Sequence, residues 1–173
     1  MADLRYPIGG FDFPGALTAA ARATAIAEIA GTPDRLQNAV RGLTADQLDT
    51  SYRPEGWTVR QVVHHLPDSH LNSYCRFKLT LAEHRPVIRT YDEAQWARLP
   101  DVSDAIEPSL DLLDALHRRW VYLLERISDE QWSRQLEHPE LGAMRLDELL
   151  ALYAWHGRHH VAHITELRKR EGW

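Results

Sequence analysis

The chain has 173 residues, with 44% hydrophobic and 26% charged residues and a formal net charge of −5, which is ordinary for a globular protein. Its length suits one hydrophobic core, so we expect a single domain over residues 1–173. Lysine and arginine form no long basic run, which argues against a nucleic acid as partner. Cys75 is the single cysteine, which excludes a disulfide framework and a cysteine-based zinc site.

The N-terminal segment does not read as a secretory signal. Its alanine-rich part is interrupted by Arg22 and Glu28, and no basic region leads into an apolar one. No run of 18 or more apolar residues occurs anywhere, so we expect no membrane-spanning helix. Together with the single cysteine, these features predict a cytoplasmic protein without a membrane partner.

Helix signals recur along the chain, whereas strand signals are nearly absent. Thr32 followed by Pro33 predicts a helix N-cap with proline at the first helical position. Capping boxes, in which a hydroxyl residue and a glutamine three residues on cap a helix, are predicted at Thr44–Gln47, Thr58–Gln61 and Ser128–Gln131. We predict helices at about 15–30, 33–42, 58–84, 104–127 and 146–170.

Two stretches of the chain follow the same plan. "GLTADQLDTSYRPEGWTVRQVVHHL" and "RISDEQWSRQLEHPELGAMRLDELLALYAWH" each contain a capped turn, an extended loop and then a helix that carries histidine. Two such helix pairs suit an all-α four-helix bundle with short extra helices in its connections.

The stretch "WHGRHHVAHI" holds four of the chain's ten histidines. His156 and His160 lie one turn apart on the stripe of the helix predicted to face the core, at a spacing that lets two imidazoles bind one ion. His159 flanks this stripe beside Trp155, so the pair His159/His163 is less well placed. A lone inward histidine is more often a hydrogen-bonded core residue, but two adjacent buried rings both need partners, which favours metal binding.

A third ligand must come from another helix, because two histidines alone make a poor zinc site. His65 is the best candidate, since it shares a face with Val62 and Ser69 in the helix predicted at 58–84. His64 lies on a more polar face of that helix, and the position of His70 is ambiguous. Three histidines suit zinc or nickel and leave a coordination position for water, as in a catalytic site.

The other candidates have simpler interpretations. His84, His117 and His138 lie near loops or among charges and are predicted at the surface. Asp68 and Glu166 could orient a ligand imidazole, although solvated helix charges are the better expectation. The common protease, hydrolase-elbow and nucleotide-binding motifs are absent from the sequence.

Four segments, "LRYPIGGFDFP", "GWTVRQVVHHLPDSHLNSYCRFKLTLAE", "RTYDEAQWARLPD" and "YAWHGRHHVAHITELR", resemble the DinB/YfiT-like metal-dependent hydrolases over nearly the whole chain. The resemblance implies a four-helix bundle, a cytoplasmic homodimer and one zinc or nickel ion per subunit. The family's three ligands fall on His65 in "HLPDSH" and on His156 and His160 in "WHGRHH". Pro67 stands where the family more often has alanine. This departure from the family pattern affects the expected geometry of the helix around Pro67.

Three functions remain open from the sequence. The leading hypothesis is a metal-dependent hydrolase that activates water for attack on a small-molecule substrate. The second is a metal-dependent S-transferase that activates a low-molecular-weight thiol such as bacillithiol, because a divalent ion also lowers the pKa of a bound thiol. The third is a non-enzymatic, metal-stabilised bundle that binds a ligand.

Overall fold

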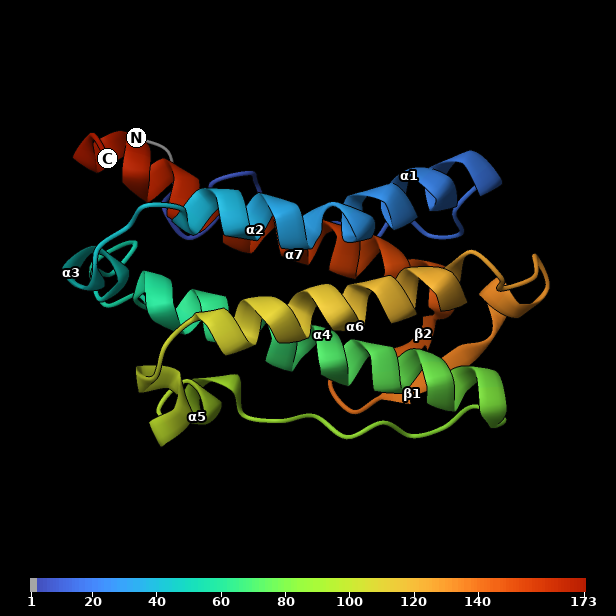
Figure 1. Ribbon diagram of the computed structural model, residues 1–173. Helices are drawn as coiled ribbons and strands as arrows, with labels where there is room; N and C mark the ends of the chain where they lie inside the picture. The colour runs from blue at the N-terminus through green and yellow to red at the C-terminus, as the bar shows by residue number, and fades with distance from the viewer. Residues whose placement is uncertain (1–2) are drawn as a thin grey trace.

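The computed structural model describes residues 3–173, and four long helical elements dominate it (Figure 1). These elements are α1 (Ala19–Ala30) together with α2 (Thr32–Val40), α4 (Val59–Ala82), α6 (Glu107–Leu124) and α7 (Leu146–Glu171). They form the all-α four-helix bundle that the sequence predicts. None of the helices in this part of the chain has the length and apolar character needed to cross a membrane.

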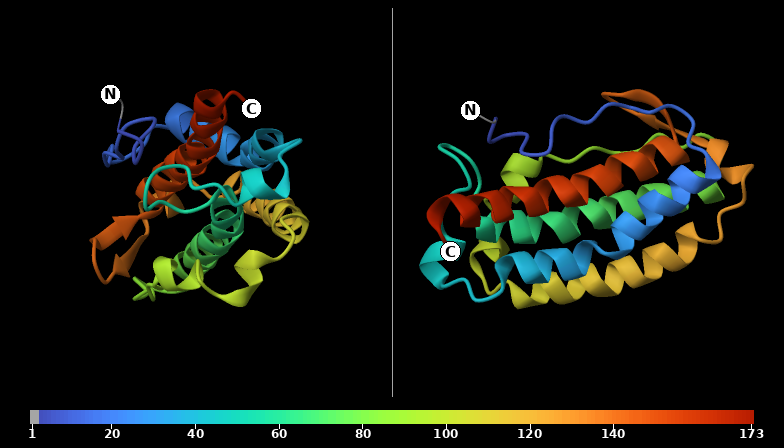
Figure 2. Two further views of the ribbon diagram at one scale, coloured as in Figure 1. Left: turned by 90° about the vertical axis from the view of Figure 1, so that its left-hand side faces the viewer. Right: turned by 90° about the horizontal axis from the view of Figure 1, so that it is seen from above.

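The order of the helices places the two histidine-rich segments side by side. Both α6 and α7 pack against α1, α2 and α4, so α1–α2 and α4 occupy opposite corners of the bundle (Figure 2). Helices α4 and α6 run in the same direction, and the long segment 83–106 returns along the outside to join them (Figure 1). Because α7 is a direct neighbour of α4, side chains of these two helices meet inside the bundle.

The connections contain short helices, as expected, and also a β-hairpin, which was not expected. Helices α3 (Ala45–Leu48) and α5 (Glu93–Trp96) and the 3-10 turns η1 (Pro100–Ser103) and η2 (Gln131–Ser133) lie between the long helices. Strands β1 (Gln135–His138) and β2 (Gly142–Arg145) form an antiparallel hairpin that the sequence did not reveal. Each strand has only four residues, too few for an alternating pattern to be recognised.

Most of the predicted caps are present. Thr44–Gln47 and Thr58–Gln61 form reciprocal capping boxes at the starts of α3 and α4. Ser128–Gln131 makes the same two hydrogen bonds but precedes the 3-10 turn η2 instead of a long helix. The prediction for Thr32 is wrong: Gly31 is the N-cap of α2, and the Thr32 hydroxyl instead donates to the Glu28 carbonyl at 2.9 Å.

The two similar stretches of sequence start their helices in the same way. The Val59 amide at the start of α4 donates to the Thr50 carbonyl at 3.1 Å. The Leu146 amide at the start of α7 donates to the Arg134 carbonyl at 3.0 Å. In each case a capped turn and an extended segment fix where the helix begins, and thereby where its histidines lie.

The core consists of two hydrophobic clusters with a polar layer between them. One cluster surrounds Phe77 and Trp120, and the other surrounds Leu66, Leu113 and Ile164. Along α4 and α6, His70 and His117 lie between the two clusters, after Leu66 and Leu113 and before Phe77 and Trp120. Burying several imidazoles in one layer is costly unless each finds a partner, so this layer is the natural place to look for a site.

Gly157 allows α7 to approach α2 closely. A Cβ atom at this position would lie 2.8 Å from the Thr32 Oγ1 and 2.9 Å from its Cγ2, and Thr32 is fully buried. We expect Gly157→Ala to lower the free energy of unfolding by about 1–2 kcal/mol in urea titrations, because the clash outweighs the helix propensity gained. Adding Thr32→Ala to this variant should recover part of the loss; strictly additive effects would contradict the proposed contact.

Candidate metal centre

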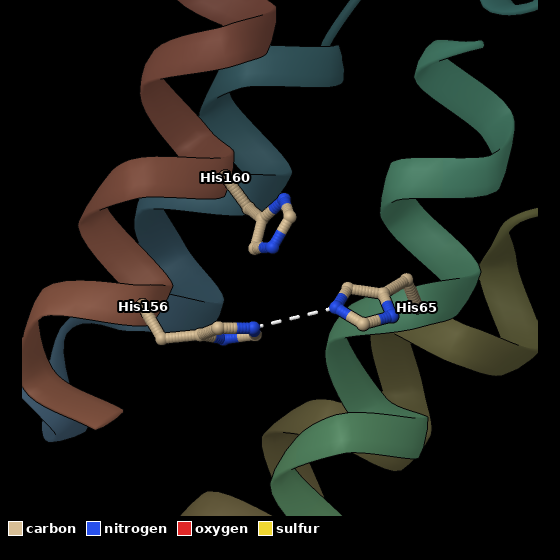
Figure 3. A group of neighbouring side chains, drawn as sticks. All are labelled: His65, His156 and His160. Atoms are coloured by element: carbon tan, nitrogen blue, oxygen red, sulfur yellow. Dashed lines mark hydrogen bonds between the residues drawn. The ribbon is translucent and has the colours of Figure 1, made fainter. Parts of the chain in front are cut away.

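The structure brings together the three histidines predicted as ligands. His65 on α4 and His156 and His160 on α7 each place a ring nitrogen so that the three atoms lie within 4.8 Å of one another (Figure 3). The Nε2 atoms of His65 and His156 are 3.3 Å apart. His65 and His160 are buried, and His156 is partly buried. Pro67 does not interrupt this arrangement, since α4 runs continuously through it.

The chemistry of this cluster fits a divalent cation. The facing nitrogens of His65 and His156 can share at most one hydrogen at 3.3 Å. Neutral imidazole nitrogens that face one another without enough hydrogens to share are unfavourable neighbours, whereas zinc and nickel accept lone pairs from them. The cluster therefore has the donor set that such an ion needs.

Burial keeps these imidazoles neutral. It lowers the pKa of His65 to about 4. The pKa values of His156 and His160 also lie well below the ordinary histidine value, because of burial first and then because of the neighbouring histidines. The lone pairs are therefore available at neutral pH without the release of a proton.

The cluster opens into a cavity of about 420 Å³. Aromatic rings form part of its wall: Trp57 packs 4.7 Å from the His65 ring, and Tyr52 stacks 3.9 Å from the His163 ring. The remaining lining comes from residues of four separate segments, namely Arg5, Tyr6, Arg53, Glu55, Gly56, Glu93, Trp155 and His159. A cavity of this size accommodates a small organic molecule beside the histidines.

The other two histidines of "WHGRHHVAHI" line the cavity wall. His159 stacks on Trp155 with their ring centroids 4.3 Å apart. The His163 Nε2–H donates to the Arg5 carbonyl at 3.1 Å, which ties the N-terminal segment to α7. His159 thus flanks the predicted ligands, and His163 lies a turn beyond them, as the helical wheel predicts.

Sequence reasoning missed several cavity residues because they come from loops. Arg53 lies in the loop before α4, and Glu93 lies on the short helix α5 of the long connection. The pKa of Glu93 is raised by burial first and then by the charges of Asp92 and Glu140. No helical periodicity marks loop positions, so only the folded chain places them beside the histidines.

The prediction for His117 is wrong. This residue is 1% exposed and lies on the inner face of α6, one turn after Leu113. The charges beside it in "DALHRRW" suggested the surface, but its spacing from the core leucines decides its position. His84 is exposed and His138 half-buried. Glu166 pairs with Lys169 on the surface at 2.9 Å, as expected for a solvated helix charge.

Residues 28–164 match the model of the DinB superfamily. The chain belongs to this superfamily. A protein of Bacillus cereus strain B4264 named "Putative metal-dependent hydrolase" is 52% identical over 173 residues, with both chains fully covered. A protein of the same name from Bacillus mycoides strain KBAB4 is 50% identical over the same length.

Solved structures with the same fold include two four-helix bundle proteins. YfiT from Bacillus subtilis, described as "a probable metal-dependent hydrolase with an unusual four-helix bundle topology", superimposes with a TM-score of 0.96. It is 47% identical, and 99% of each chain is covered. TT2238 is 19% identical, has a TM-score of 0.53 and covers 88% of this chain, so it shares the fold alone. This DinB-superfamily chain thus has the same four-helix bundle fold as YfiT, and its histidine cluster lies within that bundle.

Proposed function

We propose that this DinB-superfamily chain is a metal-dependent hydrolase of the cytoplasm that acts on a small-molecule substrate. In this proposal residues 1–173 form one DinB-like metal-binding domain and associate as a homodimer. His65, His156 and His160 hold one divalent ion per subunit, zinc as the first choice and nickel as the second. The observation that carries the proposal is the convergence of three neutral, largely buried histidines at a cavity.

A divalent ion in this position would lower the pKa of water from 15.7 to about 7, which supplies hydroxide at neutral pH. The protein's own residues provide the surroundings in which such a nucleophile acts. Trp57 and Tyr52 form apolar walls that limit access of bulk water to the histidines. Arg5 and Arg53 line the same cavity and offer donors to polar groups of a substrate.

The size and lining of the cavity also support thiol transfer as the second candidate. A volume of about 420 Å³ exceeds what a water nucleophile requires, and the two arginines suit the carboxylates of a low-molecular-weight thiol such as bacillithiol. An ion in the same position would lower the pKa of the thiol as it does that of water.

A comparison of two reactions separates these candidates. Zinc-loaded protein is tested with a panel of chromogenic carboxylic and phosphoric esters, and separately with bacillithiol plus monobromobimane. We expect ester hydrolysis that disappears after chelation and returns when zinc is restored. Metal-dependent conjugation of the bimane without ester hydrolysis would replace the hydrolase proposal by thiol transfer. Binding of zinc without either reaction would leave a ligand-binding bundle.

A further inference from the structure

A chain of buried histidines leads from the cluster to the opposite side of the bundle. The His156 Nδ1 lies 3.1 Å from the Nε2 of His70 on α4. The His70 Nδ1 lies 2.8 Å from the Nε2 of His117 on α6. The His117 Nδ1 lies 2.8 Å from the backbone carbonyl oxygen of Ile29 on α1. The chain therefore joins all four corners of the bundle.

The Ile29 carbonyl is available because of the local sequence. In a continuous helix it would accept the amide hydrogen of the residue four positions on, which here is Pro33. Proline has no N–H, so this carbonyl keeps its capacity for a side-chain donor. The break between α1 and α2 thus provides a hydrogen-bond acceptor inside the bundle.

The carbonyl fixes the direction of every hydrogen bond in the chain. A carbonyl oxygen only accepts, so the His117 Nδ1 must carry a hydrogen and donate it. Burial lowers the pKa of His117 to about 4, so at neutral pH its ring has one hydrogen and its Nε2 accepts. His70 must then donate from Nδ1 and accept at Nε2. By the same step His156 donates from Nδ1, and its Nε2 carries no hydrogen.

The surroundings leave little room for another arrangement. His70 is fully buried, and the rings of Trp120 and Tyr153 pack edge-on against it, with centroids 5.8 and 5.3 Å away. Both ring nitrogens of His70 and both of His117 have partners within the chain.

We propose that the Ile29 carbonyl sets the tautomer of His156 from the far side of the bundle, through His117 and His70 as positioning residues. The relay holds His156 with Nδ1 protonated and Nε2 bare, and it is Nε2 that faces His65 at 3.3 Å. Metal-binding histidines are commonly oriented by a carboxylate or carbonyl on their second nitrogen. Here the neutral imidazole of His70 takes that role. Because its Nδ1 donates to His117, its Nε2 accepts the hydrogen of His156.

Nitrogen NMR of the metal-free protein with 15N-labelled histidine tests the relay directly. Two-bond 15N–1H correlations distinguish the tautomers, and histidine-to-glutamine variants assign the signals. We expect the Nδ1–H tautomer for His156, His70 and His117. An Nε2–H tautomer at any of the three would overturn the proposal. The relay bears on the proposed metal site, but this measurement needs no metal, so either idea can fail without the other.

Variants at His117 test whether the relay reaches the site. In His117→Leu, His70 loses its acceptor, so we expect mixed tautomers at His156 and zinc affinity weakened about tenfold to a hundredfold in chelator competition. His117→Gln can donate to Ile29 and accept from His70, and should restore both. Leu113→Ala, one turn away on α6, is the matched core control and should keep the wild-type tautomer. If His117→Leu and Leu113→Ala had the same effects on the His156 tautomer and on zinc affinity, His117 would contribute to packing alone.

Discussion

Replacing His156 with alanine is expected to abolish stable zinc binding. The change removes one of three converging nitrogens and leaves His65 and His160, which do not suffice for a zinc site. We expect the affinity to fall by more than about a hundredfold, beyond what loss of an outer hydrogen-bond partner costs. Equilibrium dialysis with elemental analysis, supported by chelator competition, measures the loss.

His159→Ala is the control for this experiment. His159 lies three residues further along the same helix and lines the same cavity, but its ring stacks on Trp155 outside the cluster. This variant should keep one zinc per chain with affinity close to the wild type. Circular dichroism of both variants shows whether the fold is retained. If His159→Ala lost the metal and His156→Ala kept it, the assignment of ligands would be wrong.

Acid is expected to destabilise the metal-free protein steeply. Burial lowers the pKa values of both His65 and His117 from 6.5 to about 4. Between pH 6.5 and pH 4 the unfolded chain binds protons that the folded chain does not bind, so the free energy of unfolding decreases as the pH falls. Each histidine accounts for about 3 kcal/mol over this range. The free energy of unfolding of an ordinary domain is about 5–15 kcal/mol, and two such losses amount to about half of the middle of this range.

Urea titrations of chelator-treated protein from about pH 7.5 to about pH 4.5 measure this dependence. His117→Gln removes one of the two groups and should flatten the profile between pH 6.5 and pH 4. His84→Gln, at an exposed position, should leave the profile as it is in the wild type. Stability that stays constant across this interval would show that the buried histidines are not held neutral by the fold.

The sequence by itself determined the class of fold and the most informative histidines. Amphipathic periodicity identified the long helices, because a helix that packs on one face must repeat its apolar residues every three to four positions. The same periodicity set His156 and His160 apart from His159. Hydroxyl and glutamine pairs located helix starts, because capping depends on residues that are neighbours in sequence.

Only the tertiary structure decided what lies between the helices. The partner of a buried side chain is set by packing of segments far apart in sequence, which local patterns do not encode. His117 shows this best, since its charged neighbours suggested the surface whereas α4 and α1 enclose it. Arg53 and Glu93 line the cavity from connecting segments, whose positions no local pattern predicts. Packing of the four helical elements around one polar layer brings histidines from separate helices into one cluster and one chain of hydrogen bonds behind it.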